Sequence, residues 1–163
     1  MKKLWAIVGL ALLLTGCGVS ETFETLADDY AAVQSSAPQK LVFAVPDDAA
    51  EQVMQSESGT LYFCDGYEIT VQTLHAGDLD RTLRAITGYG EESLTVMRTE
   101  NGNMKRYACT WTAAGEAGDM VGRTLIVDDG NYHYCLSVTA NAQEAGSLQE
   151  SWNALFRSVE IQS

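Results

Sequence analysis

The chain has 163 residues, 46% of them apolar and 20% charged, which is the composition of one globular domain rather than of a disordered chain. It carries 22 acidic against 10 basic residues, for a net charge of −12. So acidic a surface repels phosphate backbones and anionic headgroups, which argues against nucleic-acid binding and against a charged patch that binds membranes.

Residues 1–16 have the pattern of a secretory signal peptide. Lys2 and Lys3 precede an apolar run, Leu4 to Leu14, that is shorter than the roughly 20 residues needed to span a bilayer. The run ends in Leu14-Thr15-Gly16-Cys17, with no A-x-A-like cleavage site. This ending resembles the lipobox of bacterial lipoproteins. The resemblance implies that Cys17 receives a diacylglycerol thioether and becomes the first residue of a mature chain held at the outer face of the cell membrane.

Residues 17–40 are expected to form the lipidated N-terminus and a tether. Phe23, Leu26, Tyr30 and Val33 have near-helical spacing, so a short helix is one interpretation of this segment and a flexible tether is the other. Two acyl chains, at about 0.8 kcal/mol per buried CH₂, would hold the acidic chain stably at a membrane.

Residues 41–163 are predicted to form a single domain. A β-rich run at 41–45 is followed by Pro46 and several acidic residues, a pattern that predicts a helix over 46–55. The pair Asp65-Gly66 lies between two β-rich runs and predicts a hairpin over 59–75.

Two helices and two more hairpins are predicted after this hairpin. Asp78 as N-cap and Gly88 as C-cap delimit a helix whose Leu79, Leu83 and Ile86 share one face. Hairpins are expected around Asn101-Gly102 and around Asp129-Gly130-Asn131. A last helix is predicted to begin at a capping box and to bury an apolar face; the capping residues are Ser147 and Glu150, and the face comprises Leu148, Trp152, Leu155, Phe156 and Val159.

This order of elements lacks the alternation of a parallel α/β protein. It predicts an α+β domain in which a mainly antiparallel sheet of hairpins has helices packed against it. The order resembles the Mog1/PsbP-like fold over about Leu41 to Ile161, especially where the last hairpin, NYHYCLSVTA, is followed by a helix and SVEI. Members of that fold include bacterial lipoproteins and accessory or assembly factors, so the resemblance implies no particular reaction.

With Cys17 lipidated, three cysteines remain. If the last hairpins form a meander, two strand spacings, about 9.5 Å, separate Cys109 from Cys135, which exceeds the roughly 7 Å Cα limit for a disulfide. A disulfide would then join Cys64 with Cys109 or Cys135, leaving one free thiol. The alternative is that all three are buried thiols. No C-x-x-C pair or compact Cys/His cluster predicts a metal site.

His133 and Cys135 lie two residues apart on one predicted strand face, as a thiol nucleophile and its base would. Neighbours along one strand rarely reach hydrogen-bond geometry, so we interpret His133 as a half-exposed strand residue and Cys135 as part of the core. His75 stands alone at a strand end and is expected to have a surface or packing role.

The run Asp128-Asp129-Gly130-Asn131 carries oxygen ligands but lacks the spacing of an EF-hand loop. Turn formation explains these residues, and a weak surface calcium site that includes Glu116 or Asp119 is the alternative. No catalytic residue and no cofactor is predicted.

Aromatic residues are frequent on the predicted strands: Tyr62, Tyr67, Tyr107, Trp111, Tyr132 and Tyr134. Strand alternation places Tyr132 with Tyr134 on one face, and Tyr107 with Trp111 on one face. Core packing is the first interpretation of these rings, and an exposed patch for protein or ligand contact is the second.

These features favour a membrane-anchored extracytoplasmic lipoprotein whose domain is a non-enzymatic module for protein interaction or assembly. The first alternative is a lipoprotein that binds a small ligand or a cation. The second is a thiol-dependent or hydrolytic enzyme.

Overall fold

A seven-stranded antiparallel sheet forms the centre of the domain. The structure is a computed structural model that describes residues 37–53, 59–115 and 118–162. In spatial order the strands are β2 (Ala50–Val53), β3 (Gly59–Cys64), β4 (Tyr67–His75), β8 (Tyr132–Asn141), β7 (Gly118–Asp128), β6 (Met104–Gly115) and β5 (Met97–Asn101). The predicted leader 1–16, Cys17 and the helix considered for the tether lie outside the described residues.

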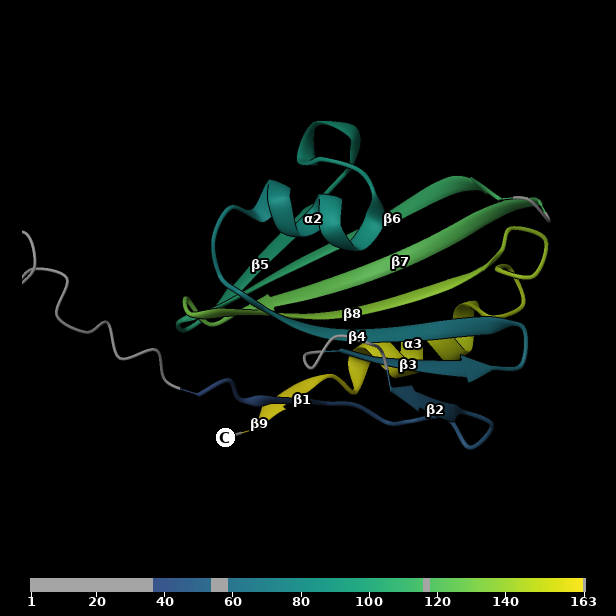
Figure 1. The fold of residues 1–163 in the computed structure, drawn as a ribbon, viewed down its shortest axis with the longest axis horizontal. Coiled ribbons are helices and arrows are strands. Elements are labelled where there is room, and N and C mark those ends of the chain that lie inside the picture. Colours follow the sequence, from purple (N-terminus) through teal and green to yellow (C-terminus); the bar gives the residue numbers. More distant parts are fainter. Residues whose placement is uncertain (1–36, 54–58, 116–117, 163) are drawn as a thin grey trace, which may run out of the picture. The chain divides into compact units, whose positions relative to one another are not determined.

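Helices pack on both faces of this sheet (Figure 1). α2 (Leu79–Thr87), followed by the 3-10 turn η1 (Glu91–Ser93), connects β4 to β5, whereas α3 (Gln149–Arg157) follows β8. Two short strands, β1 (Lys40–Val42) and β9 (Glu160–Gln162), pair antiparallel on the α3 side. The predicted α+β class with a mainly antiparallel sheet is confirmed. No helix of the described ranges is both long and apolar enough to cross a bilayer.

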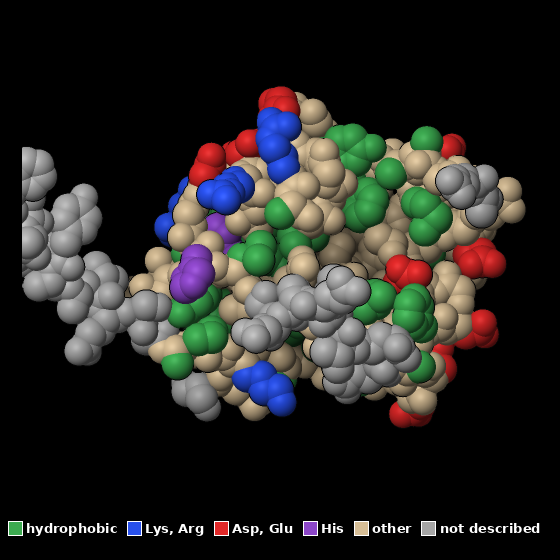
Figure 2. Space-filling model, in the orientation of Figure 1, with side chains coloured by type: hydrophobic (Ala, Val, Ile, Leu, Met, Phe, Trp, Pro, Cys, Tyr) green, Lys and Arg blue, Asp and Glu red, His purple; other side chains and the backbone are tan. Residues whose placement is uncertain are grey.

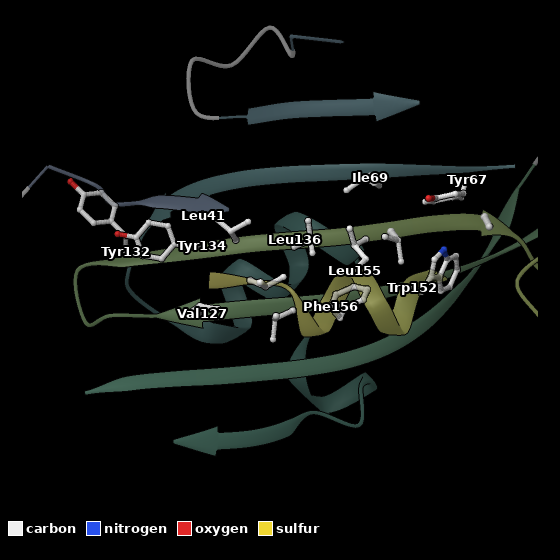
Figure 3. Packing of buried hydrophobic residues seen from close by; sticks show 14 residues of the cluster. Leu41, Tyr67, Ile69, Val127, Tyr132, Tyr134, Leu136, Trp152, Leu155 and Phe156 are labelled. Atoms are coloured by element: carbon white, nitrogen blue, oxygen red, sulfur yellow. The ribbon is translucent and has the colours of Figure 1, made fainter. Parts of the chain in front are cut away.

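The larger hydrophobic core lies between α3 and the sheet. Trp152, Leu155 and Phe156 are each less than 10% exposed and pack against Ile69 of β4 and Leu136 of β8 (Figure 3). Burying each such side chain contributes roughly 1.5–3 kcal/mol. The apolar face predicted for the last helix is therefore the one that holds α3 on the sheet.

The predicted caps of α2 are both present. The Asp78 side chain accepts a hydrogen bond from the Asp80 backbone N–H at 3.1 Å. Gly88 ends the helix with φ of 81°, a left-handed conformation that glycine adopts without the steric cost of a Cβ. Leu83 is fully buried in the second core, which lies between α2 and the opposite face of the sheet.

The three predicted hairpins are β3–β4, β5–β6 and β7–β8. β6 also pairs with β7, so β5 to β8 form the expected meander. In the last turn, the Asp129 carboxylate accepts hydrogen bonds from the N–H groups of Asn131 and Tyr132. Asx-type bonds of this kind stabilise a turn without any metal ion.

The helix predicted over 46–55 is wrong. The Ala49 N–H donates to the Pro46 carbonyl in a turn, and the chain then continues as β2, which pairs with β3 from Ala50 opposite Phe63 to Val53 opposite Thr60. A helix of this length is marginal by itself. The edge of β3 provides backbone hydrogen-bond partners for every residue of β2. Local helix propensity cannot predict this pairing, because β3 lies further along the chain.

The predicted capping box is also wrong. α3 begins at Gln149, Leu148 is its N-cap residue, and no side chain caps the first turn. The Ser147 hydroxyl donates instead to the Glu144 carbonyl at 2.8 Å, inside the turn that precedes the helix. The apolar contacts of α3 with the sheet hold the helix in place without this cap.

Candidate functional site

β8 divides its side chains between the two faces of the sheet. Tyr134 and Leu136 point into the α3 core, whereas His133 and Cys135 point toward α2. His133 is 2% exposed and Cys135 is 1% exposed, so both are fully buried. The sequence was right that they share a face and wrong that His133 is half-exposed, because it could not show that α2 covers this part of β8.

His133 is held between a helix hydroxyl and a strand carboxylate. Its Nδ1 lies 2.8 Å from Thr82 Oγ1 of α2, and its Nε2 lies 3.8 Å from Asp128 Oδ2 of β7. Burial lowers the pKa of His133, and the carboxylates of Asp128 and Asp129 only partly oppose this effect. The imidazole is therefore neutral near pH 7.

The order Thr82, His133, Asp128 superficially matches a nucleophile, a base and an orienting acid. The exposed fractions of these residues are 6%, 2% and 8%, so no substrate atom reaches the Thr82 hydroxyl in this conformation. The hydrogen bond between Thr82 and His133 joins α2 to the sheet.

Cys135 and His133 do not form a catalytic pair. The Cys135 thiol faces the His133 backbone carbonyl at 3.8 Å rather than the imidazole. Burial raises the pKa of Cys135 to about 12. Since the thiolate is the nucleophilic form, a thiol in this position is inert.

Cys64, Cys109 and Cys135 are free thiols in the structure. Cys64 packs with the α3 core, whereas Cys109 and Cys135 belong to the α2 core on the other face of the sheet. β7 separates Cys109 from Cys135, as the predicted meander requires. In this arrangement the possible disulfide of Cys64 with Cys109 or Cys135 would have to join opposite faces of the sheet.

The carboxylates of the acidic turn between β7 and β8 accept hydrogen bonds from neighbouring groups of the protein. Asp128 Oδ1 accepts the Gly130 N–H at 2.7 Å, and Asp129 Oδ2 accepts the Tyr134 hydroxyl at 2.8 Å. Burial raises the pKa of Asp129, but its hydrogen bonds outweigh this and leave the pKa below its usual value. Within the described residues, no group of three or more His, Cys, Asp or Glu side chains is placed to hold a metal ion. Glu116 lies outside those residues.

Most of the strand aromatics are core residues. Tyr67, Tyr107, Tyr132 and Tyr134 are less than 10% exposed, and Tyr62 is partly buried. His75 is exposed at the end of β4, with its ring centroid 5.0 Å from that of Tyr132. Two aromatic side chains, Phe63 and Trp111, lie instead on the part of the α2 face that α2 leaves uncovered.

One row of residues crosses that uncovered part of the sheet. The strand register places Phe63 opposite Glu68, Glu68 opposite Thr139, Thr139 opposite Gly122 and Gly122 opposite Trp111. Directly opposed residues of antiparallel strands point to the same face. We call these five residues the open strip, because Phe63 is 44% exposed, Glu68 is exposed, and Thr139 and Trp111 are partly exposed.

Trp111 forms one end of the open strip. Its indole lies directly over Gly122, where a Cβ would overlap the ring, and its Nε1–H donates to Thr124 Oγ1 at 3.2 Å. Gly122 therefore provides the space that lets the ring lie flat on the sheet. A pocket of about 310 Å³ adjoins this end and is lined by Tyr89, Ser93, Leu94, Thr110, Trp111, Thr112 and Val121.

Figure 2 shows this face of the molecule, with hydrophobic side chains beyond α2 gathered around a hollowed strip of other atoms. The sequence reasoning missed Phe63 and Glu68. The run Leu61-Tyr62-Phe63-Cys64 could have indicated this surface. A strand with one solvated face normally alternates apolar with polar residues, so four apolar residues in a row imply that an apolar side chain lies on each face.

No family model and no curated protein sequence matches this chain. Three solved structures are similar in fold, although the identities are low. One is the PsbP protein (CyanoP) of the cyanobacterium Synechocystis sp. PCC 6803, with a TM-score of 0.57 and 7% identity over 80% of this chain and 96% of that chain. Another is LpqN of Mycobacterium tuberculosis, described as involved in cell envelope biogenesis, with a TM-score of 0.50 and 14% identity over 80% of this chain and 88% of that one.

The third similar structure is a protein of Bacteroides thetaiotaomicron VPI-5482, with a TM-score of 0.52 and 14% identity over 76% of this chain. The match spans only 45% of the Bacteroides chain. At these identities the likeness concerns the fold alone. The chain has the PsbP-like fold that the order of its elements predicted.

Proposed function

We propose that this chain is an extracytoplasmic lipoprotein, held at the outer face of the cell membrane by lipid on Cys17, whose domain is a non-enzymatic module for protein interaction or assembly. The observation that carries the proposal is the run Leu14-Thr15-Gly16-Cys17 at the end of a short apolar segment with a basic start. The likeness in fold to LpqN, whose description names cell envelope biogenesis, supports a location in the envelope.

The burial of the candidate nucleophiles supports a non-enzymatic role. The Thr82 hydroxyl, the His133 imidazole and the Cys135 thiol are all buried between α2 and the sheet, and each has a polar contact inside the protein. The accessible side chains of the open strip are aromatic, hydroxyl and carboxylate groups, which are suited to contact with another molecule.

Cys17→Ser tests the anchor. The variant should leave the membrane fraction or accumulate as an uncleaved precursor, because serine cannot form the thioether. Cys64→Ser is the matched control and should remain in the membrane fraction. Mass spectrometry of the unaltered protein should find a mature chain that begins at Cys17 and carries acyl mass. Cleavage with full membrane retention of Cys17→Ser would disprove the anchor.

Cross-linking and pull-down from membranes, with the intact lipidated chain as bait, tests the interaction role. Recovery of a reproducible stoichiometric partner supports it. Recovery of no partner, together with a melting temperature that calcium or a metabolite raises, would show that the interaction role is wrong.

Binding of a small ligand is the second candidate function, and a pocket of about 400 Å³ favours it. Residues of β5, β6, β7 and β9 form the pocket, which is lined by Thr99, Glu100, Asn101, Met104, Arg106, Val127 and Ile161. Its volume is within the range of ligand sites, and the Arg106 guanidinium could hold a carboxylate group. A metabolite that raises the melting temperature of the unaltered chain and of Arg157→Met, but not of Arg106→Met, would establish this function.

A further inference from the structure

The open strip is an accessible surface with one unneutralised charge. Glu68 is exposed, and its carboxylate has no hydrogen bond or ion pair with any described residue. The nearest rows on the same face consist of Leu61, Thr70, Ser137, Thr124 and Cys109 on one side and Asn141, Met120 and Ala113 on the other. None of these carries a positive charge. The one arginine of β7, Arg123, lies on the opposite face, 4.5 Å from the Phe156 ring centroid.

An aromatic ring lies at each end of the open strip, the row that contains Glu68. Phe63 lies on β3, and the Trp111 ring lies over Gly122 of β7, three strand spacings away. At about 4.8 Å a spacing, the strip between the rings is about 14 Å wide. That width matches about four residues of an extended chain at about 3.3 Å per residue.

The net charge of the chain indicates which kind of molecule the open strip would bind. Lys2 and Lys3 belong to the leader, so the rest of the chain has 8 basic against 22 acidic residues, a net charge of −14. A second copy of the chain or a polyanion would be repelled. A cationic side chain would gain a charge-assisted hydrogen bond at Glu68, and a cation placed over the Phe63 or Trp111 ring would gain attraction to that ring's face.

We propose that the open strip binds an extended basic segment of a partner protein, with an Arg or Lys side chain on Glu68 and neighbouring side chains on Phe63 and Trp111. This inference rests on the interaction role proposed above and names the chemistry of the partner. The Thr139 hydroxyl, in the middle of the row, is placed to hydrogen-bond the bound segment.

The test is a titration of the full chain in detergent micelles, labelled with ¹⁵N at tryptophan. The probe is a synthetic peptide of alternating Arg and Leu, and the comparison ligands are the same peptide with Glu in place of Arg and a neutral oligosaccharide. The indole N–H resonance of Trp111 should shift saturably with the basic peptide alone. The resonance of Trp152, which is buried on the other face of the sheet, should not move.

Matched variants separate the strip from diffuse electrostatic attraction. Phe63→Ser and Glu68→Gln should each weaken binding of the basic peptide at least fivefold at physiological salt. Glu160→Gln removes the same charge from an exposed residue of β9 and should change the affinity less than twofold. Equal weakening by Glu68→Gln and Glu160→Gln, no saturable shift of Trp111, or a shift caused by the oligosaccharide alone would each overturn the proposal.

The same variants separate this inference from the proposed function. If membrane pull-down recovers a partner equally well with Phe63→Ser and with the unaltered chain, the strip is not the docking surface, although the interaction role stands. If the pull-down recovers no partner and calcium or a metabolite raises the melting temperature, while the peptide still binds at Trp111, the strip has the proposed chemistry but the interaction role is wrong.

Discussion

Replacing His133 by Gln should make the free energy of unfolding less dependent on pH below pH 6.5, the ordinary pKa of histidine. In the folded chain the imidazole is buried between Thr82 of α2 and Asp128 of β7. Burial lowers its pKa from 6.5, whereas Asp128 and Asp129 oppose the shift and Lys105 adds to it. Gln is neutral at every pH and retains an oxygen that can accept a hydrogen bond from Thr82.

The sign of the effect follows from where the proton binds. Below pH 6.5 the unfolded chain binds a proton at His133, but the folded chain stays neutral until the pH reaches its lower folded-state pKa. The free energy of unfolding therefore decreases as the pH is lowered through this window, by at most about 1.4 kcal/mol per pH unit. Above pH 6.5 this contribution to the slope fades, and it is negligible about one pH unit higher, where both states are deprotonated.

Urea denaturation at intervals between pH 7.5 and pH 5 would measure the effect. The unaltered chain should lose stability over this range faster than His133→Gln, because carboxylates contribute equally to both proteins. His75→Gln is the control: it replaces the other of the two histidines, which is exposed. Parallel curves for the unaltered chain and His133→Gln would refute the conclusion that burial keeps His133 neutral.

Three further predictions concern packing and thiol reactivity. Gly122→Ala should cost about 1–3 kcal/mol and change the tryptophan fluorescence, because the new Cβ displaces the Trp111 ring. Leu155→Ala should cost about 2–5 kcal/mol in urea denaturation, because the residue is 4% exposed in the α3 core. In the native protein Cys135, whose pKa burial raises to about 12, should resist a thiol reagent that modifies the partly exposed Cys64, as peptide mass spectrometry would show.

Each of these predictions has a control on the same chain. Gly77→Ala should leave stability and fluorescence unchanged, because nothing lies within 4 Å of the added Cβ. Val45→Ala should change stability by no more than about 0.5 kcal/mol, because Val45 is 47% exposed. Reaction of Cys135 as fast as Cys64 would contradict its burial, and an unfolded sample should show both thiols reactive.

Features whose cause is local in the chain were predictable. The Asp78 and Gly88 caps of α2 follow from hydrogen bonding and backbone conformation within one turn. The hairpins follow from Asp65-Gly66, from Asn101-Gly102 and from the acidic turn near Gly130, each between two β-rich runs. Their order was also enough to indicate the PsbP-like fold.

Features that depend on what lies next to a segment were not predictable. Residues 46–55 carry helix-start residues, yet the free edge of β3 makes Ala50–Val53 a strand. His133 was expected to be half-exposed and is buried, because α2 crosses above it. Phe63 and Glu68 became a candidate surface only once the register showed which residues share their row.

The sequence by itself predicted the basic leader over residues 1–16, and it determined the acidic character of the chain and the type and order of most of its elements, because these depend on neighbouring residues and on composition. Only the tertiary structure decided which side of the sheet α2 covers and how far that cover extends. It thereby decided that His133 and Cys135 are buried and that Glu68 and Trp111 share an accessible surface. Burial and register arise from contacts between segments far apart in the chain, and no local pattern of residues encodes them.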